Sequence, residues 1–185
     1  MDNKKDNNFK FILYLDMDGV LTSEDYIIKI HESLMNDMTK EEYRYRNFMQ
    51  QYCFQKEAID CLNKVYDKFP FVTILSSTRR FEFIPTEWNT IFRINDYKSY
   101  IGGRTDKLKH YTNNRYSWRA DEIRNYHFKE KSMFNFKDIP FIIIDDDNFD
   151  LLEFEDKLIH VTTKHGLTLD YYDEIIQKLE IQGVK

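Results

Sequence analysis

Three apolar segments of this chain each end abruptly in acidic or hydroxyl side chains, and this pattern constrains the fold most. The segments are "FILYLDMD", ending in Asp16 and Asp18, "FVTILSS", ending in Ser76 and Ser77, and "FIIIDDD", ending in Asp145, Asp146 and Asp147. Each is short and rich in β-branched and aromatic residues, which predicts a buried strand rather than a helix. We therefore expect strands over residues 9–16, 71–77 and 141–147.

The segments between these strands carry helical patterns. We expect one or two helices within residues 24–50, and single helices over 55–67, 117–128 and 168–182. Ser117 would be the N-cap of the helix over 117–128. A fourth short strand is expected over residues 158–163. Residues 81–118 look irregular, with Pro85, a turn at Gly102–Gly103 and a possible short strand near Tyr100–Ile101.

Continuous apolar strands that alternate with helices predict an α/β fold with a doubly wound, Rossmann-like parallel sheet covered on both faces. We expect residues 1–185 to form one domain, in which 23–52 is a small helical cap insertion and 81–118 could hold a second one. The formal net charge of −5 disfavours general nucleic-acid binding. The polar N-terminus and the lack of a long apolar stretch predict a cytoplasmic protein without a membrane segment, and leave the oligomeric state open.

The carboxyl ends of parallel strands meet at one edge of the sheet, so the polar segment ends should lie together. Each has an ordinary explanation on its own: an aspartate turn, a solvated acidic loop or an N-cap. Together they place so many carboxylates at one edge that a cation is needed, and oxygen ligands favour Mg²⁺. An EF-hand is excluded because Gly19 stands at the wrong position for the calcium loop.

The segment "LYLDMDGVLT" resembles the first motif of the haloacid dehalogenase (HAD) superfamily. "TILSS" resembles its second motif and "IIIDDDNFD" its fourth, in the required order. The runs "LSSTRR", "RADEI", "IIIDDD" and "HGLT" further resemble the HAD domain of multi-part, Swiss Army Knife-type RNA repair proteins. The resemblance leaves out residues 23–52 and much of 81–116.

This resemblance implies a role for each matching residue. Asp16 would be the nucleophile that forms an aspartyl phosphate, and Asp18 the general acid and base. Gly19 would let the backbone turn so that both carboxylates face one cavity. Ser76 and the backbone N–H of Ser77 would bind the phosphoryl group. The metal ligands would be Asp16, the Asp18 carbonyl, Asp145 and Asp146, with Asp150 farther out and Asp147 solvated.

The third motif of the superfamily is a Lys or Arg, which we assign to Arg119, with Lys107, Lys109 and Arg115 as rivals. The alternative for Arg119 is a surface ion pair with Glu122. Where the RNA repair group has Trp before Arg, this chain has Thr78 before Arg79. If Arg79 reaches a second phosphate, it supports a polynucleotide substrate.

We therefore expect a Mg²⁺-dependent phosphatase acting on a nucleic-acid end or a nucleotide. Residues 93–131 agree with this, because ten Lys and Arg against five acids are interleaved with aromatic rings, as in single-strand binders, although a solvated face explains them equally well. The alternatives are a phosphatase of a small metabolite and a catalytically silent metal- or phosphate-binding module. A receiver domain fits poorly, since its phosphate-accepting Asp lies on a middle strand.

Overall fold

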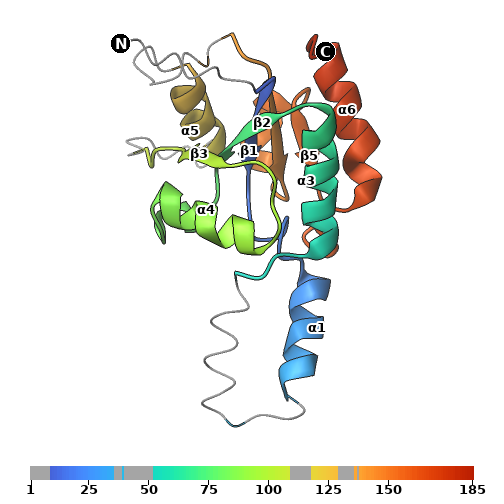
Figure 1. The fold of residues 1–185 in the computed structure, drawn as a ribbon. Coiled ribbons are helices and arrows are strands. Elements are labelled where there is room, and N and C mark those ends of the chain that lie inside the picture. The colour runs from blue at the N-terminus through green and yellow to red at the C-terminus, as the bar shows by residue number, and fades with distance from the viewer. Residues whose placement is uncertain (1–8, 36–38, 40–51, 109–117, 129–135, 137) are drawn as a thin grey trace, which may run out of the picture.

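The structure is a computed structural model that describes residues 9–35, 39, 52–108, 118–128, 136 and 138–185. Within these residues lie five strands: β1 (Phe11–Leu15), β2 (Phe71–Leu75), β3 (Ile101–Arg104), β4 (Phe141–Asp145) and β5 (Leu158–His160). They form one parallel sheet in the order β3-β2-β1-β4-β5 (Figure 1). The expected doubly wound α/β fold is therefore confirmed.

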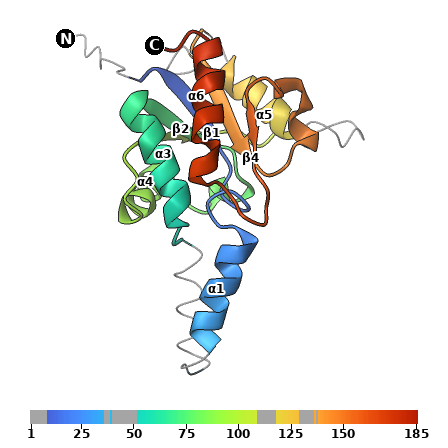
Figure 2. The same ribbon diagram turned by 90° about the vertical axis from the view of Figure 1, so that its right-hand side faces the viewer.

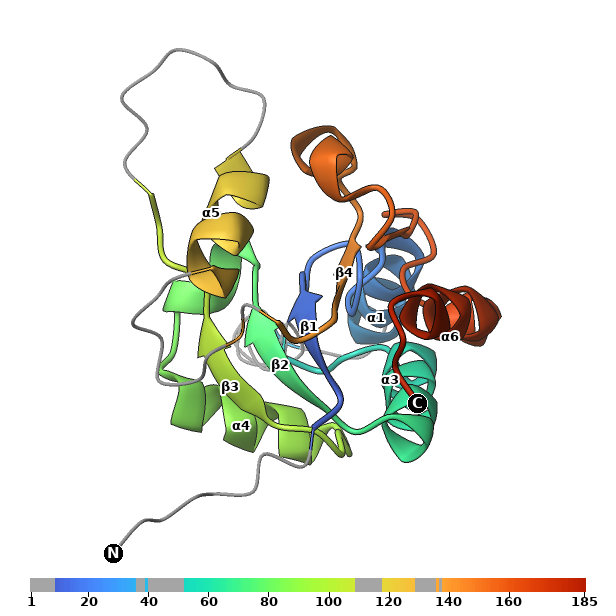
Figure 3. The same cartoon turned by 90° about the horizontal axis from the view of Figure 1, so that it is seen from above.

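Helices cover both faces of this sheet. The described helices are α1 (Glu24–Met35), α3 (Lys56–Lys68), α4 (Pro85–Ile94), α5 (Trp118–His127) and α6 (Tyr172–Ile181), with short 3₁₀ helices η1 (Thr78–Phe81), η2 (Phe149–Phe154) and η3 (Leu169–Tyr171). The core side chains of α3, α4 and α6 pack with alternate residues of β1, such as Leu13, on one face. Those of α5 and η2 pack with the other alternate residues, such as Tyr14, on the opposite face (Figure 3).

The strands are shorter than predicted because the polar residues lie beyond them. Ser76 and Ser77 follow β2, and Asp146 and Asp147 follow β4. The apolar residues of β1, β2 and β4 are all buried. The first polar residue after β1 and after β2, Asp16 and Ser76, still donates a backbone hydrogen bond to the neighbouring strand, and the residues after them form loops at the carboxyl edge.

The prediction that residues 81–118 are irregular was wrong for helix α4. Pro85 stands at the first helical position, where its missing N–H costs no hydrogen bond, so it begins a helix rather than breaking one. The Glu87 carboxylate accepts a hydrogen bond from the Ile84 N–H at 3.0 Å and caps the helix. Trp88 and Phe92 are buried in the core, so α4 packs as part of the body and is not a second cap.

Gly102 and Gly103 lie inside β3 and not in the expected turn. A Cβ on Gly102 would approach Val72 Cγ2 to 2.4 Å, and one on Gly103 would approach the Tyr126 hydroxyl to 2.2 Å. The glycines therefore allow Val72 and Tyr126, which belong to or pack against the core cluster on the α5 side of the sheet, to pack closely against this edge strand, where the register with β2 also shifts.

Helix α1 is the described part of the segment expected to be a cap. It extends away from the sheet and the other helices (Figures 1 and 2). The possible second helix within 36–50 lies outside the described residues, apart from Thr39, as does Ser117. None of the helices described has the length and hydropathy that a membrane span requires.

Candidate active site

One row of polar side chains crosses the carboxyl edge of the sheet. The N–H of Asp16 donates to the Ile144 carbonyl at 3.0 Å, and the N–H of Ser76 donates to the Leu15 carbonyl at 2.9 Å. The Asp145 residue that ends β4 thus lies beside Asp16, which lies beside Ser76. The prediction that acids and hydroxyls of separate strands meet at one edge holds for these residues.

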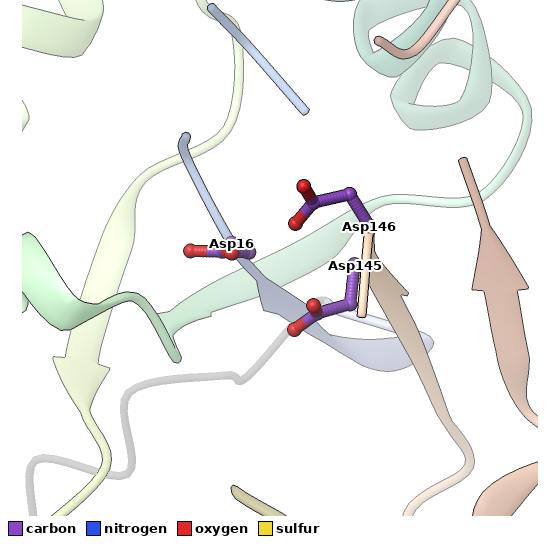
Figure 4. A group of neighbouring side chains, drawn as sticks. All are labelled: Asp16, Asp145 and Asp146. Carbon is purple, nitrogen blue, oxygen red and sulfur yellow. The ribbon is translucent and has the colours of Figure 1, made fainter. Parts of the chain in front are cut away.

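Three carboxylates gather at the centre of this row. Asp16, Asp145 and Asp146 each offer an oxygen within 4.8 Å of the others, from the ends of β1 and β4 (Figure 4). Burial and the nearby Asp16 charge raise the pKa of Asp145 well above its ordinary value, although Arg119 opposes the shift. The cluster therefore holds more negative charge than its surroundings stabilise unaided.

Arg119, near the start of α5, supplies positive charge to the cluster. Its Nη1 lies 2.8 Å from Asp16 Oδ2 and 2.5 Å from Asp145 Oδ2. Burial lowers the pKa of Arg119, but the two carboxylates outweigh it and raise the pKa overall. The alternative, an exposed Arg119 paired with Glu122, is wrong, because Glu122 pairs with another arginine.

Gly19 allows the loop after β1 to approach the acid cluster. Its φ of +74° is favourable for glycine, and a Cβ there would lie only 2.1 Å from Asp146 Oδ2. The Asp146 carboxylate also accepts a hydrogen bond from Thr163 Oγ1 at 2.8 Å. The backbone carbonyl oxygen of Asp146 lies 3.1 Å from His160 Nε2. His160 is the last residue of β5, and Thr163 lies in the loop after it. No sequence motif pointed to either residue.

Asp18 lies outside the acid cluster, with an exposed side chain held by Arg79. Arg79 Nη1 is 3.3 Å from Asp18 Oδ1, and Arg79 Nε is 3.2 Å from Glu82 Oε2. The Arg79 guanidinium also lies over the ring of Tyr52. Partial burial raises the pKa of Asp18 above its ordinary value, and Arg79 only partly offsets this effect. A carboxyl of raised pKa suits proton transfer.

Two hydroxyls at the edge are buried and lack a hydrogen-bond partner within the described part of the chain, Ser76 Oγ and Thr105 Oγ1. Ser77 differs, because its Oγ accepts a hydrogen bond from the Arg79 N–H at 3.3 Å. A buried hydroxyl without a partner is uncommon and marks a place where a ligand can complete the bond. Thr105 was missed because it follows the weak edge strand β3.

Arg80 is a buried residue for which no sequence motif predicted a role. It donates to the carbonyls of Ser77 at 2.7 Å and Thr105 at 2.9 Å, and its Nη2 lies 2.7 Å from Glu122 Oε2 on α5. Burial lowers the pKa of Arg80, with Glu122 opposing. Arg80 thus joins the loop after β2, the end of β3 and the helix that carries Arg119.

The other described basic residues of 93–131 differ in whether they form ion pairs. Lys98 pairs with Asp67, and Arg124 pairs with Asp121 and Glu153. The rival third-motif residue Lys107 is exposed, whereas Lys109 and Arg115 lie outside the described residues. Of the six basic residues of 93–131 that the structure describes, Lys98, Arg119 and Arg124 form ion pairs, whereas Arg93 and Lys107 are exposed.

A protein-family model described as "HAD domain in Swiss Army Knife RNA repair proteins" matches residues 12–171. The chain belongs to this family. No curated protein and no solved structure matches the chain. Membership accounts for the fold and points to a phosphohydrolase, and the acid cluster of this HAD domain fits a metal site.

The donor set fits a hard divalent cation. Ligand oxygens on one Mg²⁺ lie about 3–4 Å apart, since each is about 2.1 Å from the ion. The oxygens of Asp16, Asp145 and Asp146 need to move little from their present spacing of up to 4.8 Å. The bond from Thr163 and the turn at Gly19 already orient Asp146.

Proposed function

We propose that this chain is a Mg²⁺-dependent phosphohydrolase that forms an aspartyl phosphate on Asp16. The observation that carries the proposal is the buried Asp16 carboxylate, which shares Arg119 with Asp145 and lies beside the Ser76 hydroxyl, which has no hydrogen-bond partner among the described residues. Phosphoryl transfer depends on positioning and charge neutralisation, and these residues supply both.

In the first step Asp16 attacks phosphorus, while Ser76, the Ser77 N–H and Arg119 bind the phosphoryl oxygens. Asp18 gives its proton to the leaving oxygen, which its raised pKa favours. In the second step Asp18 takes a proton from water, which attacks the aspartyl phosphate and releases Asp16. Asp16, Asp145, Asp146 and the Asp18 carbonyl would hold Mg²⁺, which when bound neutralises the negative charge of the phosphoryl group.

We propose a nucleic-acid end or a nucleotide as the substrate. The family is described by RNA repair, and Arg79 lies beside Asp18, where it would pair with a further phosphate by exchanging its carboxylate partners Asp18 and Glu82. The domain would span residues 1–185, with 23–52 as a short cap. Because α1 extends away from the body, such a cap leaves room for an extended substrate (Figure 2).

Hydrolysis of p-nitrophenyl phosphate with Mg²⁺ or EDTA tests the chemistry. Asp16→Asn should abolish turnover, since an amide is not a nucleophile, whereas Asp60→Asn, at an exposed surface pair, should leave turnover unchanged. An Asp16→Asn protein that remains active would sink the nucleophile assignment. Mg²⁺ binding without any turnover would favour the silent module.

A substrate panel tests the second half of the proposal. Oligonucleotides with a 3′ or a 5′ phosphate, nucleotides and sugar phosphates would be compared by kcat/KM. We expect the highest values for the oligonucleotides or nucleotides. A clear preference for sugar phosphates would show that the enzyme acts on small metabolites.

A further inference from the structure

A second buried hydroxyl continues the row beyond Ser76. The N–H of Thr105 donates to the Leu75 carbonyl at 2.9 Å, just as the N–H of Ser76 donates to the Leu15 carbonyl at 2.9 Å. Thr105 therefore stands to β3 as Ser76 stands to β2. Neighbouring strands are about 4.8 Å apart, so the two hydroxyls occupy adjacent positions of the row.

Both hydroxyls belong to the same face of the sheet. Side chains alternate along a strand, so Ser76 lies on the face of Ile74, and Thr105 lies on the face of Gly103, which is paired with Ile74. Ile74 packs in the cluster that contains residues of α5. This is the face on which Arg119 of α5 reaches the acid cluster.

Thr105 has no structural use for its hydroxyl within the described part of the chain. The residue is fully buried and its Oγ1 has no hydrogen-bond partner there, whereas its carbonyl is bound by Arg80. Burying a hydroxyl without a partner destabilises a folded protein, so a group of this kind calls for an explanation. A phosphoryl group has several oxygens, of which one hydroxyl can bind only one.

We propose that Thr105 is a substrate-binding residue, whose hydroxyl donates a hydrogen bond to a phosphoryl oxygen adjacent to the one bound by Ser76. The inference rests on the proposed phosphohydrolase function and adds to it a residue of β3. The phosphoryl group is then held by three side chains, Asp16, Ser76 and Thr105. Each of them directly follows one of the neighbouring strands β1, β2 and β3.

Thr73 offers a matched control in the same sheet. It is equally buried, but its hydroxyl lies 2.5 Å from the Tyr97 hydroxyl and is therefore satisfied within the protein. Valine replaces a threonine hydroxyl by a methyl group of similar size. The variants Thr105→Val and Thr73→Val thus remove an unsatisfied and a satisfied hydroxyl respectively.

The experiment measures Tm, turnover of p-nitrophenyl phosphate and inorganic phosphate binding by calorimetry, all with Mg²⁺. Thr105→Val should raise Tm by about 2–4 °C without phosphate, since it removes an unpaired polar group. It should also lower kcat/KM and weaken phosphate binding by about 10- to 100-fold. Thr105→Ser should keep both within about threefold, because it keeps the hydroxyl. Thr73→Val should lower Tm and change neither property.

A Thr105→Val protein with a lower Tm would show that the hydroxyl is already bonded, for instance to water, and would overturn the inference. Unchanged phosphate binding and unchanged turnover in this variant would overturn it as well. Phosphate binding distinguishes the two proposals. If the wild type binds phosphate but hydrolyses nothing, the proposed function fails, while the comparison of Thr105→Val with wild type still decides the role of Thr105. A wild type that binds no phosphate overturns both.

Discussion

Breaking the buried Arg80–Glu122 ion pair on one side only should destabilise the protein strongly. The two side chains are 7% and 11% exposed, and Arg80 Nη2 lies 2.7 Å from Glu122 Oε2. Glu122→Met removes the carboxylate but keeps a long helix-forming side chain on α5. The Arg80 charge then remains buried, and among the described residues its side chain keeps the carbonyls of Ser77 and Thr105 as acceptors. Breaking one side of a buried pair costs about 3–5 kcal/mol, and these carbonyls favour the lower end.

Urea unfolding followed by circular dichroism measures this loss. With a slope of about 2 kcal/mol per molar urea, a loss of about 3 kcal/mol moves the midpoint down by about 1.5 M. The matched control is Asp67→Asn, which breaks the exposed Lys98–Asp67 pair of 2.6 Å. Exposed pairs contribute at most about 1 kcal/mol, so the control should shift the midpoint by less than about 0.5 M.

The double variant Arg80→Met/Glu122→Met separates the two causes of this loss. Replacing both charges by apolar side chains removes the uncompensated charge, so the double variant should recover most of the lost stability. The reasoning is refuted if Glu122→Met shifts the midpoint no more than Asp67→Asn does. It is refuted too if the double variant loses as much as the two single variants combined.

Three further predictions concern the site and its surroundings. Gly19→Ala should weaken Mg²⁺ binding in calorimetry by about tenfold or more, because its Cβ would displace the Asp146 carboxylate, and unchanged affinity would contradict this. Mg²⁺ at 100 times its Kd should stabilise the protein to urea by about 2.7 kcal/mol, and Asp146→Asn should remove much of this gain if Asp146 is a ligand. Burial and Lys157 lower the pKa of His127 to about 4. The unfolded state, with a histidine pKa of about 6.5, binds the proton first, so stability should fall by up to about 3 kcal/mol between pH 6.5 and 4. His127→Gln should flatten this slope, and an equally steep slope in the variant would argue against the assignment.

The sequence predicted the parallel sheet and its acidic edge well, for a local reason. The apolar runs that end at Asp16, Ser76 and Asp145 identify strands without any knowledge of their neighbours. Since all strands run in parallel, their polar ends had to share one edge. The roles assigned to those residues remain predictions that the experiments above test.

The wrong predictions concern residues whose backbone conformation depends on the residues around them. Pro85 begins α4 because the chain before it is extended, and Gly102–Gly103 lie in a strand because Val72 and Tyr126 pack against them. The small size of glycine and the fixed φ of proline indicate turns equally well. A local pattern alone does not distinguish these cases.

By itself the sequence determined the three buried strands β1, β2 and β4, the acidic and hydroxyl residues that end them, and the family. These depend on neighbouring residues and on short motifs. Only the tertiary structure decided that Arg119 joins Asp16 to Asp145, that Glu122 belongs to Arg80, and that Thr105 lies beside Ser76. Such contacts link residues 26 or more positions apart, and they depend on how α5 and β3 pack against the sheet, which no local preference specifies.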